Sequence, residues 1–178
     1  MTESTLHDVV QICTADQLVA VDALERDLYL MKADALNPLA FSPPAASTHH
    51  VAFVAFGNIH PTEGDLHRIA VEILESGAVY ICAWGFGAER FHDVCDDVLV
   101  ASDSERSEQT VIMTTWHDEP LEDALFFALT ATPPAAAYQD TCRATLVIVL
   151  DDAALAVKVD AILADPVEFV AKMWASDA

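Results

Sequence analysis

The sequence predicts an α/β protein, a three-layer sandwich on a mainly parallel sheet of at least four strands, flavodoxin-like or Rossmann-like. Four apolar runs, typical of strands buried on both faces, lie near residues 51–56, 79–84, 110–116 and 145–150. The segments that follow these runs carry apolar residues at helical spacing. Because parallel strands need crossover connections, this alternation predicts parallel strands with helices on both faces of the sheet.

The first part of the chain is predicted to form an N-terminal helical appendage. A short strand is expected over residues 8–13, and Thr14 with Gln17 matches a capping box at a helix start. Apolar residues at helical spacing then extend the predicted helix towards Asn37; they are Leu18, Val21, Leu24, Leu28 and Met31.

Three prolines between residues 35 and 50 prevent regular structure there, so we expect a surface linker. The appendage and its proline-rich linker occupy residues 1–48 in this interpretation. The α/β domain then occupies residues 49–178.

Each strand of the predicted domain is followed by a helix. The first of these helices carries apolar residues at i, i+3, i+4, i+7 and i+8. It ends at Gly77, where a residue in the left-handed conformation suits a helix terminus. These residues are Leu66, Ile69, Ala70, Ile73 and Leu74. The second carries Phe91, Val94, Cys95, Val98 and Leu99. The third helix has Pro120 in its first turn, the fourth runs over 153–164, and a last short helix follows Pro166.

The charge of the chain is strongly unbalanced. Eight Lys and Arg face 29 Asp and Glu, which gives a formal net charge of −21 at pH 7. Such a surface repels phosphate backbones and anionic lipids, so we expect neither direct nucleic-acid binding nor membrane binding. The acidity favours a basic protein partner, although solubility alone also accounts for it.

The compartment predicted for this chain is the cytoplasm. No apolar stretch approaches the roughly 20 residues that span a bilayer, and the N-terminus lacks the features of a signal peptide. The four cysteines form no C-x-x-C pair, which argues against a zinc ribbon or a thioredoxin-type centre. We expect reduced, buried thiols at Cys13, Cys82, Cys95 and Cys142.

A candidate site follows from the fold, because loops after parallel strands open on one edge of the sheet. Gly85 and Gly87 end the second apolar run, and polar residues follow both this run and the third. The candidate catalytic residues are Glu89, His92, Asp93, His117, Asp118 and Glu119.

Several chemistries compete for these residues. A metal site could draw on His92, Asp93, His117 and Asp118, whereas helix capping by Asp118 or Glu119 is the structural alternative. Metal binding is therefore left open.

A cysteine nucleophile at Cys82, with His92 or His117 as its base, competes with a simple core position for this thiol. No cofactor is predicted, because Arg90 replaces the third glycine of the dinucleotide-binding pattern that begins at Gly85.

The run Tyr80-Ile-Cys-Ala-Trp-Gly85, with Glu89-Arg90, His92-Asp93 and Trp116 to Glu122, resembles an uncharacterised bacterial family, a domain of unknown function. The resemblance covers roughly residues 50–150 and implies no activity.

Two functions therefore remain. The first is a cytosolic binding module that recognises a basic partner, in the manner of toxin-neutralising immunity proteins. The alternative is a hydrolytic enzyme with a His/Asp/Glu site, with or without a metal, at the carboxyl edge of the sheet.

Overall fold

The sheet has six strands in the order β1-β2-β6-β3-β4-β5. The computed structural model describes residues 9–20, 23–33, 39, 47–58, 60–102 and 108–176. The elements are β1 (Val9–Cys13), α1 (Ala15–Val19), β2 (Asp27–Ala33), β3 (His49–Phe56), α2 (Glu63–Glu75), β4 (Ala78–Gly85), α3 (Ala88–Ser102), β5 (Met113–His117), α4 (Leu121–Thr130), η1 (Ala136–Tyr138), β6 (Cys142–Leu150), α5 (Ala153–Ile162) and α6 (Pro166–Ser176).

The four predicted strands are β3, β4, β5 and β6, and their parallel pairing is confirmed. β3 lies between β4 and β6, so Phe53 pairs with both Cys82 and Val147. The predicted α/β class is likewise confirmed. The strand order differs from those of flavodoxin-like and Rossmann-like sheets, with which this sheet shares its parallel strands and flanking helices.

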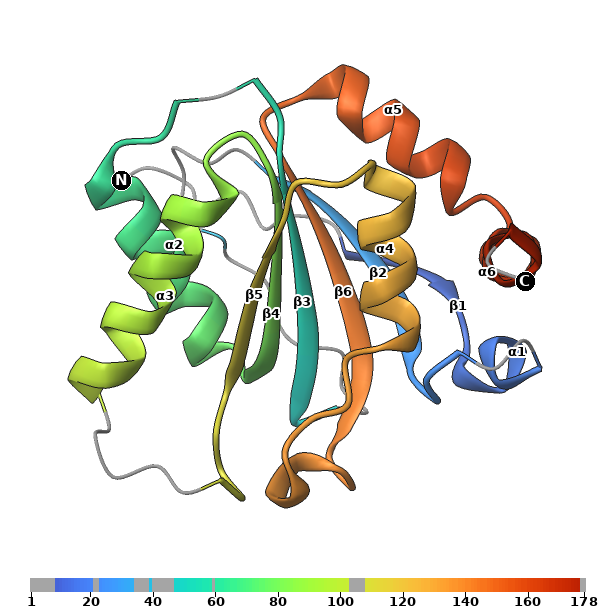
Figure 1. Cartoon of the computed structure of the whole chain (residues 1–178), viewed down its shortest axis with the longest axis horizontal. Helices are drawn as coiled ribbons and strands as arrows, with labels where there is room; N and C mark the ends of the chain where they lie inside the picture. Colours follow the sequence, from blue (N-terminus) through green and yellow to red (C-terminus); the bar gives the residue numbers. More distant parts are fainter. Residues whose placement is uncertain are drawn as a thin grey trace.

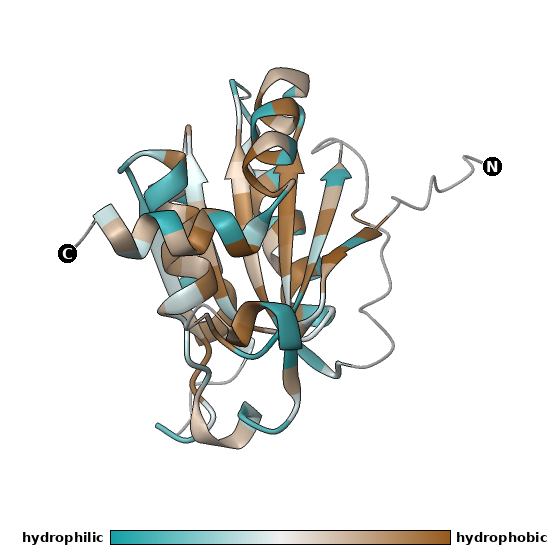
Figure 2. Ribbon diagram, turned by 90° about the vertical axis from the view of Figure 1, so that its right-hand side faces the viewer, coloured by the Kyte–Doolittle hydropathy of each residue, from teal (hydrophilic) through white to brown (hydrophobic). Residues whose placement is uncertain are grey.

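The apolar core lies on both faces of the sheet because β3 is apolar along its whole length. Val51, Phe53 and Ala55 face one core, and the alternating residues Ala52 and Val54 face the other. Helices α2 and α3 close the second core, and α4, α5 and α6 close the first, as Figure 1 shows. Figure 2 shows that the apolar colouring is concentrated in the strands and that polar bands lie on the helices.

The N-terminal segment differs from the prediction. The short strand expected near residues 8–13 is confirmed as β1, but α1 ends at Val19 and residues 27–33 form β2. β2 pairs in parallel with β6 over its whole length, from Asp27 with Ala144 to Ala33 with Leu150. The expected linker falls largely outside the described residues.

The tertiary environment explains why this second half of the predicted helix is a strand. Leu, Met, Lys and Ala favour a helix locally, but β6 presents a strand edge beside them. Pairing with β6 buries Leu28, Leu30 and Met31 at no more than 4% exposure, which an exposed helix could not match. None of the described helices combines the length and apolarity required to cross a bilayer.

His50 is a buried histidine at the start of β3. It is 0% exposed, and its Nε2 lies 3.4 Å from Ser76 Oγ. Burial, assisted by the neighbouring His49, lowers the pKa of His50 to about 4. The folded protein therefore holds His50 neutral at pH values where the unfolded chain protonates it.

This difference predicts acid sensitivity. Between pH 6.5 and about 4 the unfolded chain binds more protons than the folded protein does. The free energy of unfolding therefore falls by about 1.4 kcal/mol for each unit by which the pH is lowered. On acidification from pH 7.5 to 5, we expect the free energy of unfolding, measured by urea denaturation, to fall by about 2 kcal/mol more in the protein than in its His50→Gln variant. The control is His67→Gln, at an exposed position on α2. An equal loss in the protein and in His50→Gln would contradict the assignment.

Candidate functional site

Two crevices are expected at the carboxyl edge of the sheet, where neighbouring strands lead to helices on opposite faces. β3 leads to α2 on one face, while its neighbour β6 leads to α5 on the other. In the same way, β4 leads to α3 and its neighbour β5 leads to α4. Each pair of loops diverges and leaves space above the strand ends.

The crevice between β3 and β6 is bridged by hydrogen bonds of Asp152. Its Oδ1 accepts the Leu155 amide at 2.8 Å, which caps α5, and its Oδ2 accepts the Asn58 amide at 3.3 Å. A Cβ atom on Gly57 would lie 2.2 Å from the Asp152 Cβ, so only glycine permits this approach. The backbone hydrogen bonds also lower the pKa of Asp152. Asp152 therefore has a structural role.

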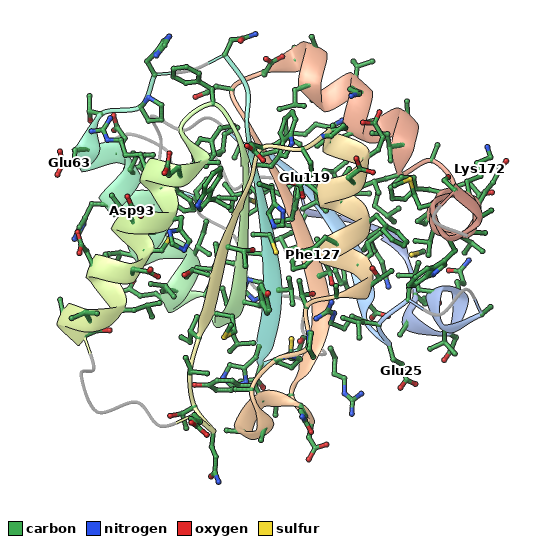
Figure 3. The ribbon with its side chains drawn as sticks, viewed as in Figure 1. Glu25, Glu63, Asp93, Glu119, Phe127 and Lys172 are labelled. Atoms are coloured by element: carbon green, nitrogen blue, oxygen red, sulfur yellow. The ribbon has the colours of Figure 1, made fainter. Side chains whose placement is uncertain are left out.

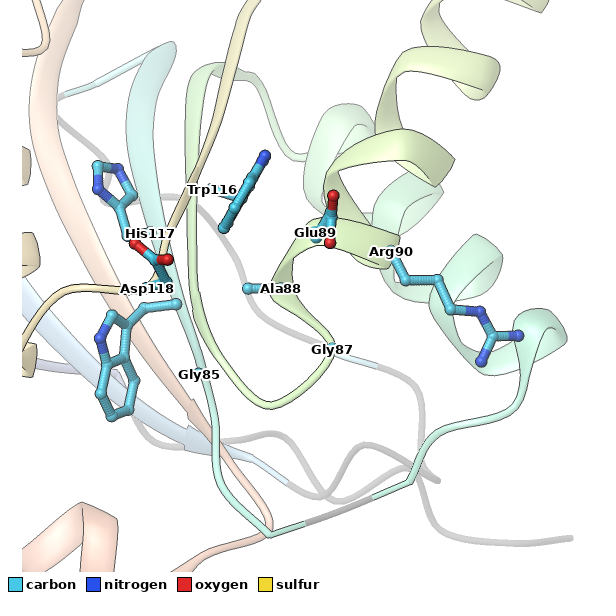
Figure 4. A pocket seen from close by; sticks show the side chains of 9 residues that line it. Gly85, Gly87, Ala88, Glu89, Arg90, Trp116, His117 and Asp118 are labelled. Atoms are coloured by element: carbon cyan, nitrogen blue, oxygen red, sulfur yellow. The ribbon is translucent and has the colours of Figure 1, made fainter.

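The crevice between β4 and β5 remains open as a pocket of about 410 Å³. We call it the β4–β5 pocket. Its lining residues, nearly all labelled in Figure 4, are Trp84, Gly85, Gly87, Ala88, Glu89, Arg90, Trp116, His117 and Asp118. The pocket depends on the turn at Gly85, which has φ +93°, because a Cβ there would lie 2.1 Å from the Phe56 carbonyl oxygen.

The pocket brings together three of the six candidate residues, Glu89, His117 and Asp118. His92 and Asp93 lie further along α3 and are not among its lining residues. His92 Nδ1 is 3.2 Å from Asp93 Oδ1, and its Nε2 is 3.7 Å from Asp96 Oδ2. Among the described residues, no group of three or more His, Cys, Asp or Glu is placed to hold a metal ion.

Glu119, the sixth candidate, bonds to His117 and does not cap α4. Its Oε1 lies 2.6 Å from His117 Nδ1, and Pro120 is the N-cap residue, with no side-chain capping bond. The capping role considered for Asp118 or Glu119 is therefore wrong. Burial alone would raise the pKa of Glu119, but hydrogen bonds from its own backbone and from His117 lower it below the ordinary value.

His117 is held on both sides of its ring. The side chain is 8% exposed, and its Nε2 lies 3.1 Å from Thr115 Oγ1, opposite the contact with Glu119. The ring also packs against Phe127, with ring centroids 4.8 Å apart. Figure 3 shows Glu119 and Phe127 over the middle of the sheet, near α4. These contacts form a fixed chain of hydroxyl, imidazole and carboxylate.

Cys82 is a core residue of β4. It is 0% exposed, and burial raises its pKa to about 12, with the nearby Thr115 hydroxyl acting in the opposite direction. A thiol with this pKa is almost entirely protonated at neutral pH, so it is a poor nucleophile. The nucleophile hypothesis for Cys82 is therefore not supported.

Two tryptophans that are not among the candidate catalytic residues also line the pocket. Trp84 lies at the end of β4 and donates its Nε1–H to the Glu119 carbonyl at 2.8 Å. Trp116 lies near the end of the edge strand β5 and is 42% exposed. The signal that could have identified them is their position, since each occupies one of the last two residues of a strand that leads into the candidate loops.

The layer of α2 and α3 carries most of its charge as carboxylates. The two helices contain eight acids and two cations, a formal charge of −6. The acids are Glu63, Asp65, Glu72, Glu75, Glu89, Asp93, Asp96 and Asp97. The cations are Arg68, 3.0 Å from Glu72, and Arg90, 3.5 Å from Glu63. We call the exposed carboxylates of these helices the acidic surface; Figure 3 labels Glu63 and Asp93 on it.

Fold and site together define an α/β protein with a pocket at a carboxyl-edge crossover and an acidic helical layer. The chain belongs to the family described as Domain of unknown function (DUF7684), whose model matches residues 28–166. The resemblance to an uncharacterised domain family is thus confirmed, and the match begins earlier than expected and includes β2. No curated protein and no solved structure matches the chain significantly.

The burial of the thiols leads to a prediction. Cys13, Cys82, Cys95 and Cys142 are all free and at most 5% exposed, and burial raises the pKa of each. In a chromogenic disulfide assay at pH 7.5, the native protein should react slowly, whereas the urea-unfolded protein should release four equivalents promptly. A single fast-reacting thiol in the native protein would contradict this prediction.

Proposed function

We propose that this protein is a binding module that recognises a basic protein partner through the acidic surface of α2 and α3. The observation that carries the proposal is the formal charge of −6 on these two helices. Six of the eight acids have no cation of their own layer to balance them, so their field extends into solvent. Such a field accelerates the encounter with a cationic protein and orients it.

The arrangement of charges along α3 supports the same proposal. Glu89, Asp93 and Asp97 follow one another at i, i+4 and i+8, so like charges are neighbours on one face of the helix. Each such pair destabilises an isolated helix by about 0.2–0.5 kcal/mol. A cationic partner would remove this repulsion.

Exposed apolar side chains flank these charges. Phe86, in the turn that precedes α3, is 54% exposed, and Val100, in the last turn of α3, is 70% exposed. Protein interfaces combine an apolar centre with a polar rim. The two ends of α3 would supply apolar contacts beside its carboxylates.

The class of binder that this acidity suits is the toxin-neutralising immunity protein, with a basic toxin as its partner. The proposal places the protein in the bacterial cytoplasm, away from nucleic acid and from the membrane surface. The negative field disfavours binding to either of these polyanions.

Partner capture followed by kinetics tests the proposal. The protein is immobilised at low salt, and the captured partner is identified and purified. Its association rate is then measured across a salt series. We expect a basic partner whose association slows steeply as salt rises. The triple variant Glu75→Gln, Asp93→Asn, Asp97→Asn should lower the association rate by about tenfold at low salt.

The matched control removes three exposed carboxylates from elsewhere on the molecule, in Glu25→Gln, Asp123→Asn, Asp140→Asn. A small unrelated cationic protein serves as the control for non-specific attraction. An acidic partner, a rate indifferent to salt, or an equal effect of the two triple variants would contradict the proposal.

The second candidate function is a hydrolase, and one observation favours it. Thr115, His117 and Glu119 form the hydroxyl–imidazole–carboxylate chain that activates nucleophiles in acyl-transfer enzymes. The buried position of His117 weighs against it, as does the absence of both Thr115 and His92 from the pocket lining.

For the hydrolase, a chromogenic acetate ester is the test substrate. Catalysis by this chain predicts ester hydrolysis that falls about 100-fold or more in Thr115→Val and in His117→Gln. Thr130→Val, at a threonine on α4, is the control. No hydrolysis above the buffer rate, or equal rates in all four proteins, would eliminate this candidate.

A further inference from the structure

We propose that the β4–β5 pocket receives an arginine side chain of the binding partner. The inference rests on the proposed function and assigns to the pocket the anchoring contact of that interface. Its volume of about 410 Å³ falls within the usual range of ligand pockets. Its lining combines two tryptophans with two carboxylates, which is the chemistry that recognises a planar cation.

The tryptophans provide the first half of this recognition. An indole face attracts a cation through its negative quadrupole, more strongly than the other aromatic side chains. Trp116 is 42% exposed, so its side chain is available for such a contact. Trp84 is anchored by its bond to the Glu119 carbonyl, which fixes the orientation of its indole. A guanidinium stacks on such a surface better than a lysine ammonium because it is planar and weakly hydrated.

Glu89 and Asp118 provide the second half. Figure 4 shows Trp116 and Glu89 on facing sides of the gap between β5 and the start of α3, with Ala88 below them. Asp118 lies on the opposite side of Trp116 in the same view. Ionised carboxylates only accept hydrogen bonds, and a guanidinium only donates them. A bidentate contact between the guanidinium and one of these carboxylates is therefore expected.

The positive groups at the pocket are too weak to reverse this preference. Arg90 lines the pocket, but its guanidinium lies 3.5 Å from Glu63 and points away from Trp116 in Figure 4. The start of α3 contributes about half a positive charge from its helix dipole. Two carboxylates outweigh this contribution, so an anion is disfavoured and a cation is favoured.

The pocket also has room for the ligand. A Cβ built on Gly87 would have no heavy atom within 4 Å, so the turn before α3 leaves open space. His117 forms part of the wall, and its bonds to Glu119 and Thr115 keep that wall in place. This part of the pocket wall is therefore fixed before binding.

Tryptophan indole signals in nitrogen-15 NMR provide the test. The chain has three tryptophans, and Trp174 on α6 packs against Phe126, apart from the pocket lining, so it serves as an internal control. The probes are Nα-acetyl-arginine amide, its neutral analogue Nα-acetyl-citrulline amide, and Nα-acetyl-lysine amide. We expect the arginine amide to shift the Trp84 and Trp116 signals saturably, with a Kd on the order of millimolar.

The remaining signals and probes define specificity. Trp174 should stay unchanged, the citrulline amide should leave all three signals in place, and the lysine amide should bind more weakly than the arginine amide. Unmoved signals of Trp84 and Trp116, or an equal response to citrulline, would overturn the inference. A lysine preference would overturn the assignment to arginine.

Variants separate the pocket from general acidity. Trp116→Leu and Glu89→Gln should each weaken binding of the arginine amide about 2- to 5-fold, as expected for one exposed cation–π contact or one ion pair. Asp93→Asn, which removes one charge from the same helix outside the pocket, should change the affinity less than about twofold. Equal weakening by Asp93→Asn and Glu89→Gln would reduce the effect to non-specific charge and overturn the inference.

The two proposals can fail separately. If the partner binds in a salt-sensitive manner but the arginine amide moves neither pocket indole, the inference fails and the proposed function stands. If the arginine amide binds in the pocket and no basic partner associates, the proposed function fails, and only the selectivity of the pocket for an arginine side chain stands.

Discussion

The burial of β3 on both faces is the constraint on which the rest of the structure depends. Residues Val51 to Phe56 are at most 1% exposed, so the strand needs strand neighbours on both edges and helices over both faces. The chain meets this requirement with parallel neighbours, and parallel neighbours require crossover helices. The crossovers bring the carboxyl ends of β6, β3, β4 and β5 to one edge. The position of the pocket follows from the burial of one apolar strand.

A buried arginine connects the N-terminal part of the chain to helix α4. Arg26, directly before β2, is 3% exposed and donates to the carbonyls of Ala128 and Thr132 at 3.1 and 2.9 Å, and to Thr132 Oγ1 at 2.7 Å. These acceptors lie at the carboxyl end of α4, where the helix dipole is negative and attracts a cation. Removing the arginine would leave buried acceptors without these donors, a cost of about 1–3 kcal/mol each. This contact ties the start of β2 to the carboxyl end of α4.

Charge is distributed differently from hydrophobicity in this protein. The two cores are continuous and neutral except for a few bonded polar groups, whereas the carboxylates lie outside on the helices. At the β4–β5 pocket the two patterns meet: Trp84 and Trp116 come from strand ends, and Glu89 and Asp118 come from the loops and helix that follow. A site at a strand end can therefore combine an aromatic wall with acidic acceptors, which neither the core nor the outer helical surface supplies alone.

The sequence by itself determined the α/β class, the four parallel strands β3 to β6, the helices that follow them and the edge of the sheet at which a pocket opens. These features depend on apolar periodicity and glycine turns, which are local properties. Only the tertiary structure decided that residues 27–33 form a strand, because that outcome depends on β6, more than a hundred residues away. The same holds for the pairing of Glu119 with His117 and for the separation of His92 from the pocket. A side chain's partners depend on which elements pack beside it, and that information is absent from the spacing of residues along the chain.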